Sequence, residues 1–147
     1  MGKVATRRAL LGIMVFVCLA HVWAYFAPEL WYDTFPHIGA PWQTRLGPYN
    51  EHLVTDMSAL YMALGVVTTA AMRLADSDSF VTTVGAGWLT FCVFHVLYHM
   101  QHLGMFTTGE RIALLSVLST QTLVAAALLV PSPKKKSSDT EDAAAGH

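Results

Sequence analysis

The chain has 147 residues, of which 54% are hydrophobic and 13% charged, and its net charge at neutral pH is −1. Soluble domains carry roughly 25% charged residues, so this chain has about half of the usual solvating side chains. A charge so close to zero gives no electrostatic reason to expect nucleic acid as a partner. Two cysteines exclude a disulfide-rich scaffold. The composition favours a small, one-domain integral membrane protein whose first partner is the lipid bilayer.

Four apolar runs follow one another along the chain, each close to the roughly 20 residues with which a helix crosses a bilayer. They predict an all-α fold, a four-helix transmembrane bundle, with spans at about residues 9–26, 53–74, 80–103 and 110–130. The polar–apolar alternation typical of membrane β-barrels is missing from the sequence. We therefore expect residues 1–130 to form one transmembrane domain in which consecutive helices run in opposite directions.

The segments between and after these spans are polar or rich in proline. Residues 27–50 contain four prolines and predict an outer loop without regular structure. Loops of this length often cover a site. Asn50 is predicted to cap the second span, and Thr107 to form a capping box with Glu110 before the fourth. Residues 131–147 are polar and low in complexity, so we expect a disordered cytoplasmic tail.

The basic residues predict the orientation of the chain. Seven of the nine flank the spans on one side, and only Arg45 and Arg111 lie on the other. Basic residues remain in the cytoplasm, so both termini are predicted to be cytoplasmic in a multi-pass protein of the plasma membrane. A signal peptide cleaved near Ala24 is the alternative to a first span. The bulky aromatic residues around that position favour the uncleaved span.

Histidines and carboxylates gather at the outer ends of three predicted spans. Ionisable groups within a membrane normally face the bundle interior or a watery cavity. The topology therefore predicts one polar cluster just beneath the outer surface. Its members are His21 on the first span, Glu51, His52 and Asp56 on the second, and His95, His99 and His102 on the third.

Two pairs in this cluster have the spacing of chelating side chains. His95 and His99 lie four residues apart, as do His52 and Asp56, so each pair shares one helix face. Together they predict a four-ligand site for a divalent metal ion, with zinc, iron and copper all suited to this mixture of nitrogen and oxygen ligands.

Two neighbouring residues complete this hypothesis. Glu51 and His102 are predicted to transfer protons as the catalytic groups. The protein would then be a metal-dependent oxidoreductase or hydrolase that acts on a hydrophobic substrate entering from the outer leaflet. His21, beside interfacial aromatic residues, is better explained by a structural hydrogen bond, and Gln121 of the fourth span by helix packing.

Two other functions use the same residues differently. One histidine from each of two helices would hold a b-type haem for electron transfer, with Gly65, Gly85 and Gly87 making room for the macrocycle. Alternatively, the histidines supply hydrogen bonds or pH sensing in a non-catalytic small subunit or assembly factor of a larger membrane complex, or in a homo-oligomer.

Three short motifs carry a family resemblance: PYNEHLVTD at residues 48–56, ALG at 63–65 and HVLYHMQHL at 95–103. They resemble a group of small four-helix membrane proteins of actinobacteria, some of them loosely grouped with DoxX-like proteins, whose redox association is general. The resemblance covers residues 48–103 and implies a four-helix membrane fold without a particular reaction. It also implies a role for the six candidate residues Glu51, His52, Asp56, His95, His99 and His102.

The metal hypothesis predicts that the purified protein contains zinc, iron or copper. His99→Ala should lower the metal content, because the loss of one of four ligands weakens chelation. Elemental analysis of both proteins measures this, and an unchanged content in the variant would contradict the hypothesis. An absorption spectrum of the same preparation tests the haem alternative, which requires a Soret band.

Overall fold

Helices make up most of the chain in the computed structural model, which describes residues 2–36 and 40–130. The elements are α1 (Lys3–Phe26), α2 (Pro28–Thr34), η1 (Gln43–Arg45), α3 (Glu51–Arg73), α4 (Asp78–Gln101), η2 (Leu103–Met105) and α5 (Thr108–Ala127). The described residues contain no strand, so the predicted all-α fold is confirmed for them. The tail predicted at residues 131–147, and residues 37–39 of the predicted outer loop, lie outside the described part.

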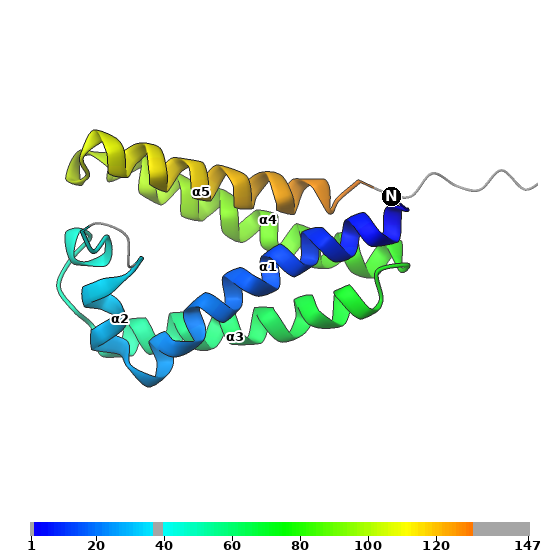
Figure 1. The fold of residues 1–147 in the computed structure, drawn as a ribbon, viewed down its shortest axis with the longest axis horizontal. Coiled ribbons are helices and arrows are strands. Elements are labelled where there is room, and N and C mark those ends of the chain that lie inside the picture. The colour runs from blue at the N-terminus through cyan, green and yellow to red at the C-terminus, as the bar shows by residue number, and fades with distance from the viewer. Residues whose placement is uncertain (1, 37–39, 131–147) are drawn as a thin grey trace, which may run out of the picture.

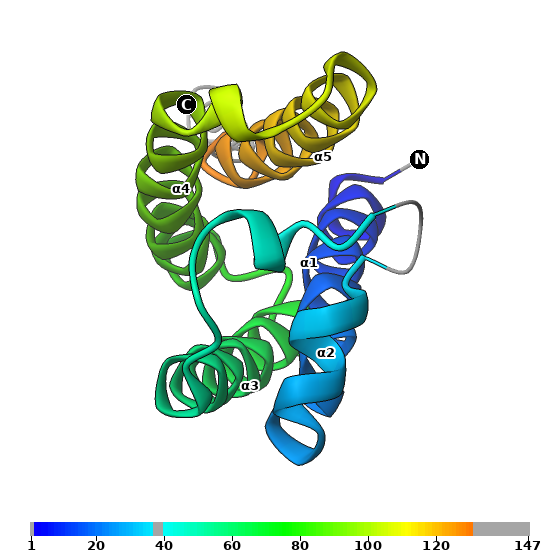
Figure 2. The same cartoon turned by 90° about the vertical axis from the view of Figure 1, so that its left-hand side faces the viewer.

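The four long helices form two antiparallel pairs, α1 with α3 and α4 with α5 (Figure 1). The pairs approach each other at the end where the α3–α4 turn and the N-terminus lie, and they diverge toward the other end. There, α2 and η1 cross in front of the diverging helices (Figure 2). We call these the narrow end and the wide end of the molecule.

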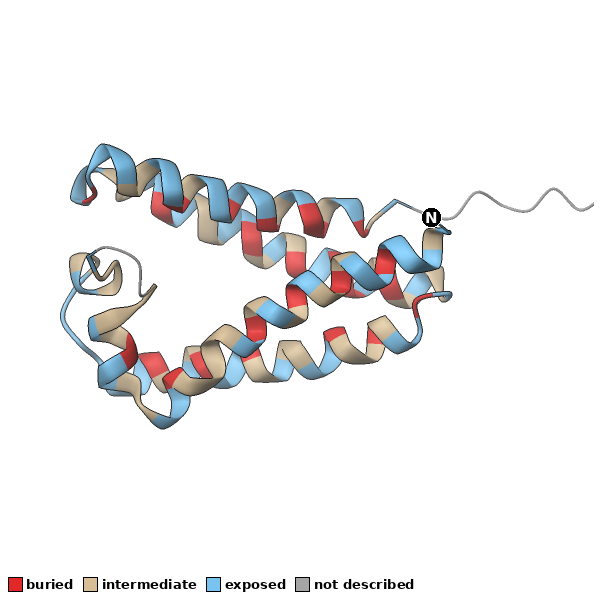
Figure 3. Ribbon diagram, in the orientation of Figure 1, coloured by how far each residue is buried: buried red, intermediate tan, exposed pale blue. Residues whose placement is uncertain are grey.

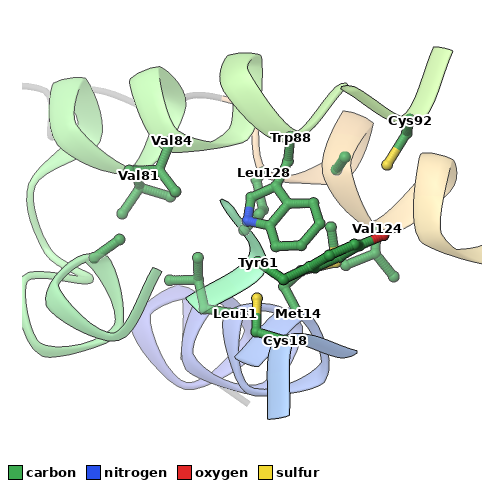
Figure 4. Close-up of a cluster of buried hydrophobic side chains, with 12 residues drawn as sticks. Leu11, Met14, Cys18, Tyr61, Val81, Val84, Trp88, Cys92, Val124 and Leu128 are labelled. Carbon is green, nitrogen blue, oxygen red and sulfur yellow. The ribbon is translucent and has the colours of Figure 1, made fainter. Parts of the chain in front are cut away.

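A buried apolar cluster joins the two pairs at and near the narrow end (Figure 4). Leu11 and Met14 of α1 pack there with Trp88 of α4 and Leu128 after α5, all fully or almost fully buried. The indole Nε1 of Trp88 donates a hydrogen bond of 2.8 Å to the Thr68 hydroxyl of α3. This bond pairs a polar atom that burial would otherwise leave without a partner.

Two glycines bring the helices of each pair close together. A methyl group added at Gly65 of α3 would lie 3.0 Å from the Cβ of Cys18, and one added at Gly85 of α4 would lie 2.8 Å from the Cβ of Leu128. Small residues at such points let neighbouring backbones approach, as is common between membrane helices.

An ion pair and a hydrogen bond connect the N-terminal part of α1 with the start of α4 and the turn before it. One guanidinium nitrogen, Nη1 of Arg7, lies 2.6 Å from the Asp78 carboxylate and donates a bond of 3.2 Å to the Ala75 carbonyl. Arg7 is buried, whereas its neighbour Arg8 is exposed. Arg7 therefore makes a tertiary contact at the narrow end, in addition to its predicted effect on the orientation of the chain.

The predicted helix caps are confirmed, but the expectation of an outer loop without regular structure is wrong in part. Asn50 accepts a bond of 3.0 Å from the Leu53 amide, and Thr107 and Glu110 form the complete capping box. Between residues 27 and 50, however, the chain forms α2 and η1. Pro28 suits the first position of α2 because its missing N–H would have no partner there, and burial of Trp31 holds the helix against α1.

Exposed residues lie along the outward faces of the helices (Figure 3), and many of them are large and hydrophobic. Phe16, Leu60, Phe94 and Leu123 are each about 70% exposed, as expected of side chains whose solvent is lipid. Three helices, α1, α3 and α4, are long and apolar enough to cross a membrane. The fourth predicted span coincides with α5, which carries several Ser and Thr residues and ends at Ala127, before the last apolar residues of the run.

The two glycines Gly85 and Gly87 of α4 provide a matched test of this packing. Gly85→Ala should lower the free energy of unfolding by about 1–3 kcal/mol, because its methyl group overlaps Leu128. Gly87→Ala should raise it by about 0.5–1 kcal/mol, because no atom lies within 4 Å of the added group and alanine favours helix. Denaturant unfolding in detergent micelles measures both, and equal effects would contradict the close contact.

Candidate functional site

A cavity of about 410 Å³ lies between the two helix pairs near the wide end. All five α-helices contribute to its wall, and Trp42 and Gln43 close it from the side of η1. We call it the hairpin cavity. Its polar lining residues come from α1, α4, α5 and the η1 segment; they are His21, Gln43, His95, His99, Ser116, Thr120 and Gln121.

Three imidazoles of this cavity belong to one connected series of ring contacts. His21 stacks on Tyr61 with ring centroids 3.9 Å apart, and Tyr61 meets Phe91 edge-on at 5.5 Å. Phe91 stacks on His95 at 5.1 Å, and His95 meets His99 edge-on at 4.7 Å. The series joins α1, α3 and α4 and gives each imidazole a defined neighbour, which restricts its rotamers.

A backbone hydrogen bond determines which nitrogen of His21 carries the proton. Its Nδ1 lies 2.8 Å from the Val17 carbonyl one turn earlier in α1. A carbonyl oxygen only accepts, so Nδ1 must donate, and in the neutral ring Nε2 then holds the lone pair. His21 therefore has one nitrogen committed to the helix and one available as an acceptor or base.

Among the described residues, three side chains that line the hairpin cavity each have a buried nitrogen with no partner at hydrogen-bond distance, although Gln121 also interacts with the Tyr61 side chain. They are Trp31 (Nε1), His99 (Nδ1) and Gln121 (Nε2), and the residues are 1%, 6% and 7% exposed. Leaving such a group unpaired costs about 1–3 kcal/mol. All three of these residues line the hairpin cavity.

The structure brings only part of the predicted metal site together. His95 and His99 line the hairpin cavity. By contrast, the side chains of His52 and Asp56 are 86% and 63% exposed, with 3.4 Å between Nε2 and Oδ2. In residues 2–36 and 40–130, no three His, Cys, Asp or Glu side chains form a group that could hold a metal ion. The predicted convergence of all four ligands is therefore not seen in the described residues.

Helical phase explains why His52 and Asp56 point away. In the first half of α3 the buried residues are Val54, Ser58 and Tyr61. Both His52 and Asp56 lie two positions from a residue of that face, or about 200° around the helix. The argument that ionisable groups turn inward applies within the hydrocarbon core. It does not hold for the first two turns of a helix at the interface, where polar groups can reach water and headgroups.

The two predicted catalytic residues also lie away from the hairpin cavity. Glu51 is the exposed first residue of α3. His102 follows α4, where its Nδ1 lies 2.7 Å from the Tyr98 carbonyl and its ring stacks on Tyr98 with centroids 4.2 Å apart. Neither residue lines the cavity.

Sequence reasoning missed Tyr61 and Trp31 as site residues and assigned structural roles to His21 and Gln121. A signal for two of them was present: His21 lies three residues after Cys18 on the buried face of α1, and Gln121 interrupts an apolar run. Trp31 reaches the cavity because α2 is a helix. The four prolines of residues 27–50 had instead predicted a loop without regular structure there. No protein-family model, curated protein or solved structure matches the chain.

Imidazole accessibility tests this division of the histidines. Diethyl pyrocarbonate should modify His52 at least about tenfold faster than His99 in the detergent-solubilised protein, because buried groups react only after local opening. Peptide mass spectrometry measures the two rates, and unfolded protein, in which they should become similar, is the control. Equal rates in the folded protein would contradict the structure, in which His52 is exposed and His99 is buried.

Proposed function

We propose that the chain is a four-span integral membrane protein of the plasma membrane, with both termini cytoplasmic and the wide end facing outward. Three apolar helices and lipid-like exposure of their outer faces support this proposal. The fourth span is α5, whose 20 residues extend over about 30 Å, the thickness of the hydrocarbon core. Lys3, Arg7, Arg8 and Arg73 all belong to the narrow end, in agreement with a cytoplasmic position.

Within this frame, we propose that the protein binds a hydrophobic molecule that carries hydrogen-bonding groups. The observation that supports this function is that three side chains with a buried, unpaired nitrogen line one cavity. Ligand sites are typically apolar cavities of about 300–1,000 Å³ with a few converging polar groups. The hairpin cavity has this size and this composition.

The polar groups would recognise a ligand by donating and accepting hydrogen bonds. The N–H groups of Trp31 and Gln121 are donors that suit a carbonyl or hydroxyl oxygen. His21 offers Nε2 as an acceptor for a hydroxyl hydrogen because Val17 holds its Nδ1. The same imidazole has the tautomer needed to take up a proton from a bound hydroxyl.

This function requires fewer assumptions than a metal-dependent reaction. Catalytic zinc commonly has three protein ligands, whereas the cavity offers the adjacent pair His95 and His99. A third ligand would have to come from a bound molecule or from His21. Binding through hydrogen bonds uses the side chains in their present positions.

His99→Leu should separate binding from stability. Removal of an unpaired buried nitrogen should leave the melting temperature unchanged or raise it, because an apolar group of similar size needs no partner. Ligand binding should weaken about tenfold, which corresponds to about 1.4 kcal/mol. His52→Leu is the matched control, since it changes an exposed histidine and should leave binding unchanged.

Photoreactive labelling measures this binding. It uses three probes with the same alkyl chain and diazirine: an alcohol, a fatty acid and a phosphatidic acid. Saturable labelling of tryptic peptide 74–111, which carries His95 and His99, is expected with at least one probe and should fall in the His99→Leu variant. Labelling by none of the three, or equal labelling of both variants, would overturn the proposed function.

A further inference from the structure

The walls of the site contain no charged side chain in the described part of the chain. The hairpin cavity adjoins a second cavity of about 560 Å³, lined by the segment 46–50 and by parts of α2, α3 and α4. We call this the loop cavity. His95, His99, Trp31, Gln43 and Met57 line both cavities, and within residues 2–36 and 40–130 no Asp, Glu, Lys or Arg residue lines either one.

This composition selects against a charged ligand. An ion moved from water into an apolar site loses its hydration and needs a counter-charge to compensate for that loss. Neither cavity supplies a permanent counter-charge. A hydroxyl or carbonyl group needs only hydrogen-bond partners, and polar side chains such as His99, Thr120 and Gln121 line the hairpin cavity.

The two cavities reach the surface at different places. The wall of the hairpin cavity extends to Ile13 of α1 and to Val117 and Thr120 of α5, all of them exposed. Ile13 lies near the middle of α1, so this opening faces the acyl-chain region of a bilayer. The loop cavity instead ends at exposed Tyr49 and Tyr98, at the wide end.

From these observations, and resting on the proposed function, we infer that the ligand is an uncharged lipid with a hydroxyl or carbonyl head. It enters from the bilayer through the opening between α1 and α5. The head reaches Trp31, His99 and Gln121, and the apolar chain remains between Ile13 and Val117. The loop cavity then gives the bound head a separate connection to the outer surface.

The three probes test the ligand class in phosphatidylcholine nanodiscs. The long-chain alcohol should label tryptic peptide 74–111 at least tenfold more strongly than the fatty acid or the phosphatidic acid. Comparable labelling by either charged probe would overturn the inference about charge and would leave the proposed function standing. Labelling by none of the probes would overturn the proposed function itself.

A bulky side chain at the opening tests the entry route. Val117→Trp should reduce alcohol labelling of the peptide about tenfold, because the indole fills the gap beside Ile13. Ile112→Trp is the control on the same helix: Ile112 is likewise more than half exposed but does not line the cavity. Labelling that is unchanged in Val117→Trp, or equally reduced in both variants, would overturn entry between α1 and α5. Matching melting temperatures show that both variants fold.

Discussion

Close backbone contact within each helix pair is the constraint on which the site depends. At Gly65 and Gly85 no side chain separates the helices, and Cys18 and Leu128 fill the contact. Each pair is held together by its own glycine contact, so any widening of the bundle occurs between the pairs. The hairpin cavity lies there, where α1 and α3 diverge from α4 and α5 (Figure 1).

The two ends of this space differ in the residues that line them. At the narrow end, Trp88 and Leu11 fill the centre and Arg7 ties α1 to the following turn. At the wide end, Trp31 of α2 lines the hairpin cavity and carries one of the three unpaired nitrogens. The short helix after Pro28 therefore contributes a residue to the site itself.

Residue spacing in the sequence was sufficient to predict which side chains of one helix share a face. His95 and His99, four residues apart, do share a face and do meet, and the caps at Asn50 and Thr107 form as expected. Spacing also paired His52 with Asp56 correctly. Spacing failed to predict whether His52 and Asp56 would face His95 and His99. The face that α3 turns inward is instead the one with Val54, Ser58 and Tyr61.

Local sequence is enough to specify the helices, most of their ends and their apolar surfaces, because these depend on near neighbours and on the solvation of each side chain. It does not specify which imidazoles share a cavity. That depends on how far each helix is rotated against its partner, and the rotation follows from contacts such as Gly65 with Cys18 between residues distant in the chain. His21, Tyr61 and Gln121 line one cavity with His95 and His99 for this reason, whereas His52 and Asp56 remain outside it.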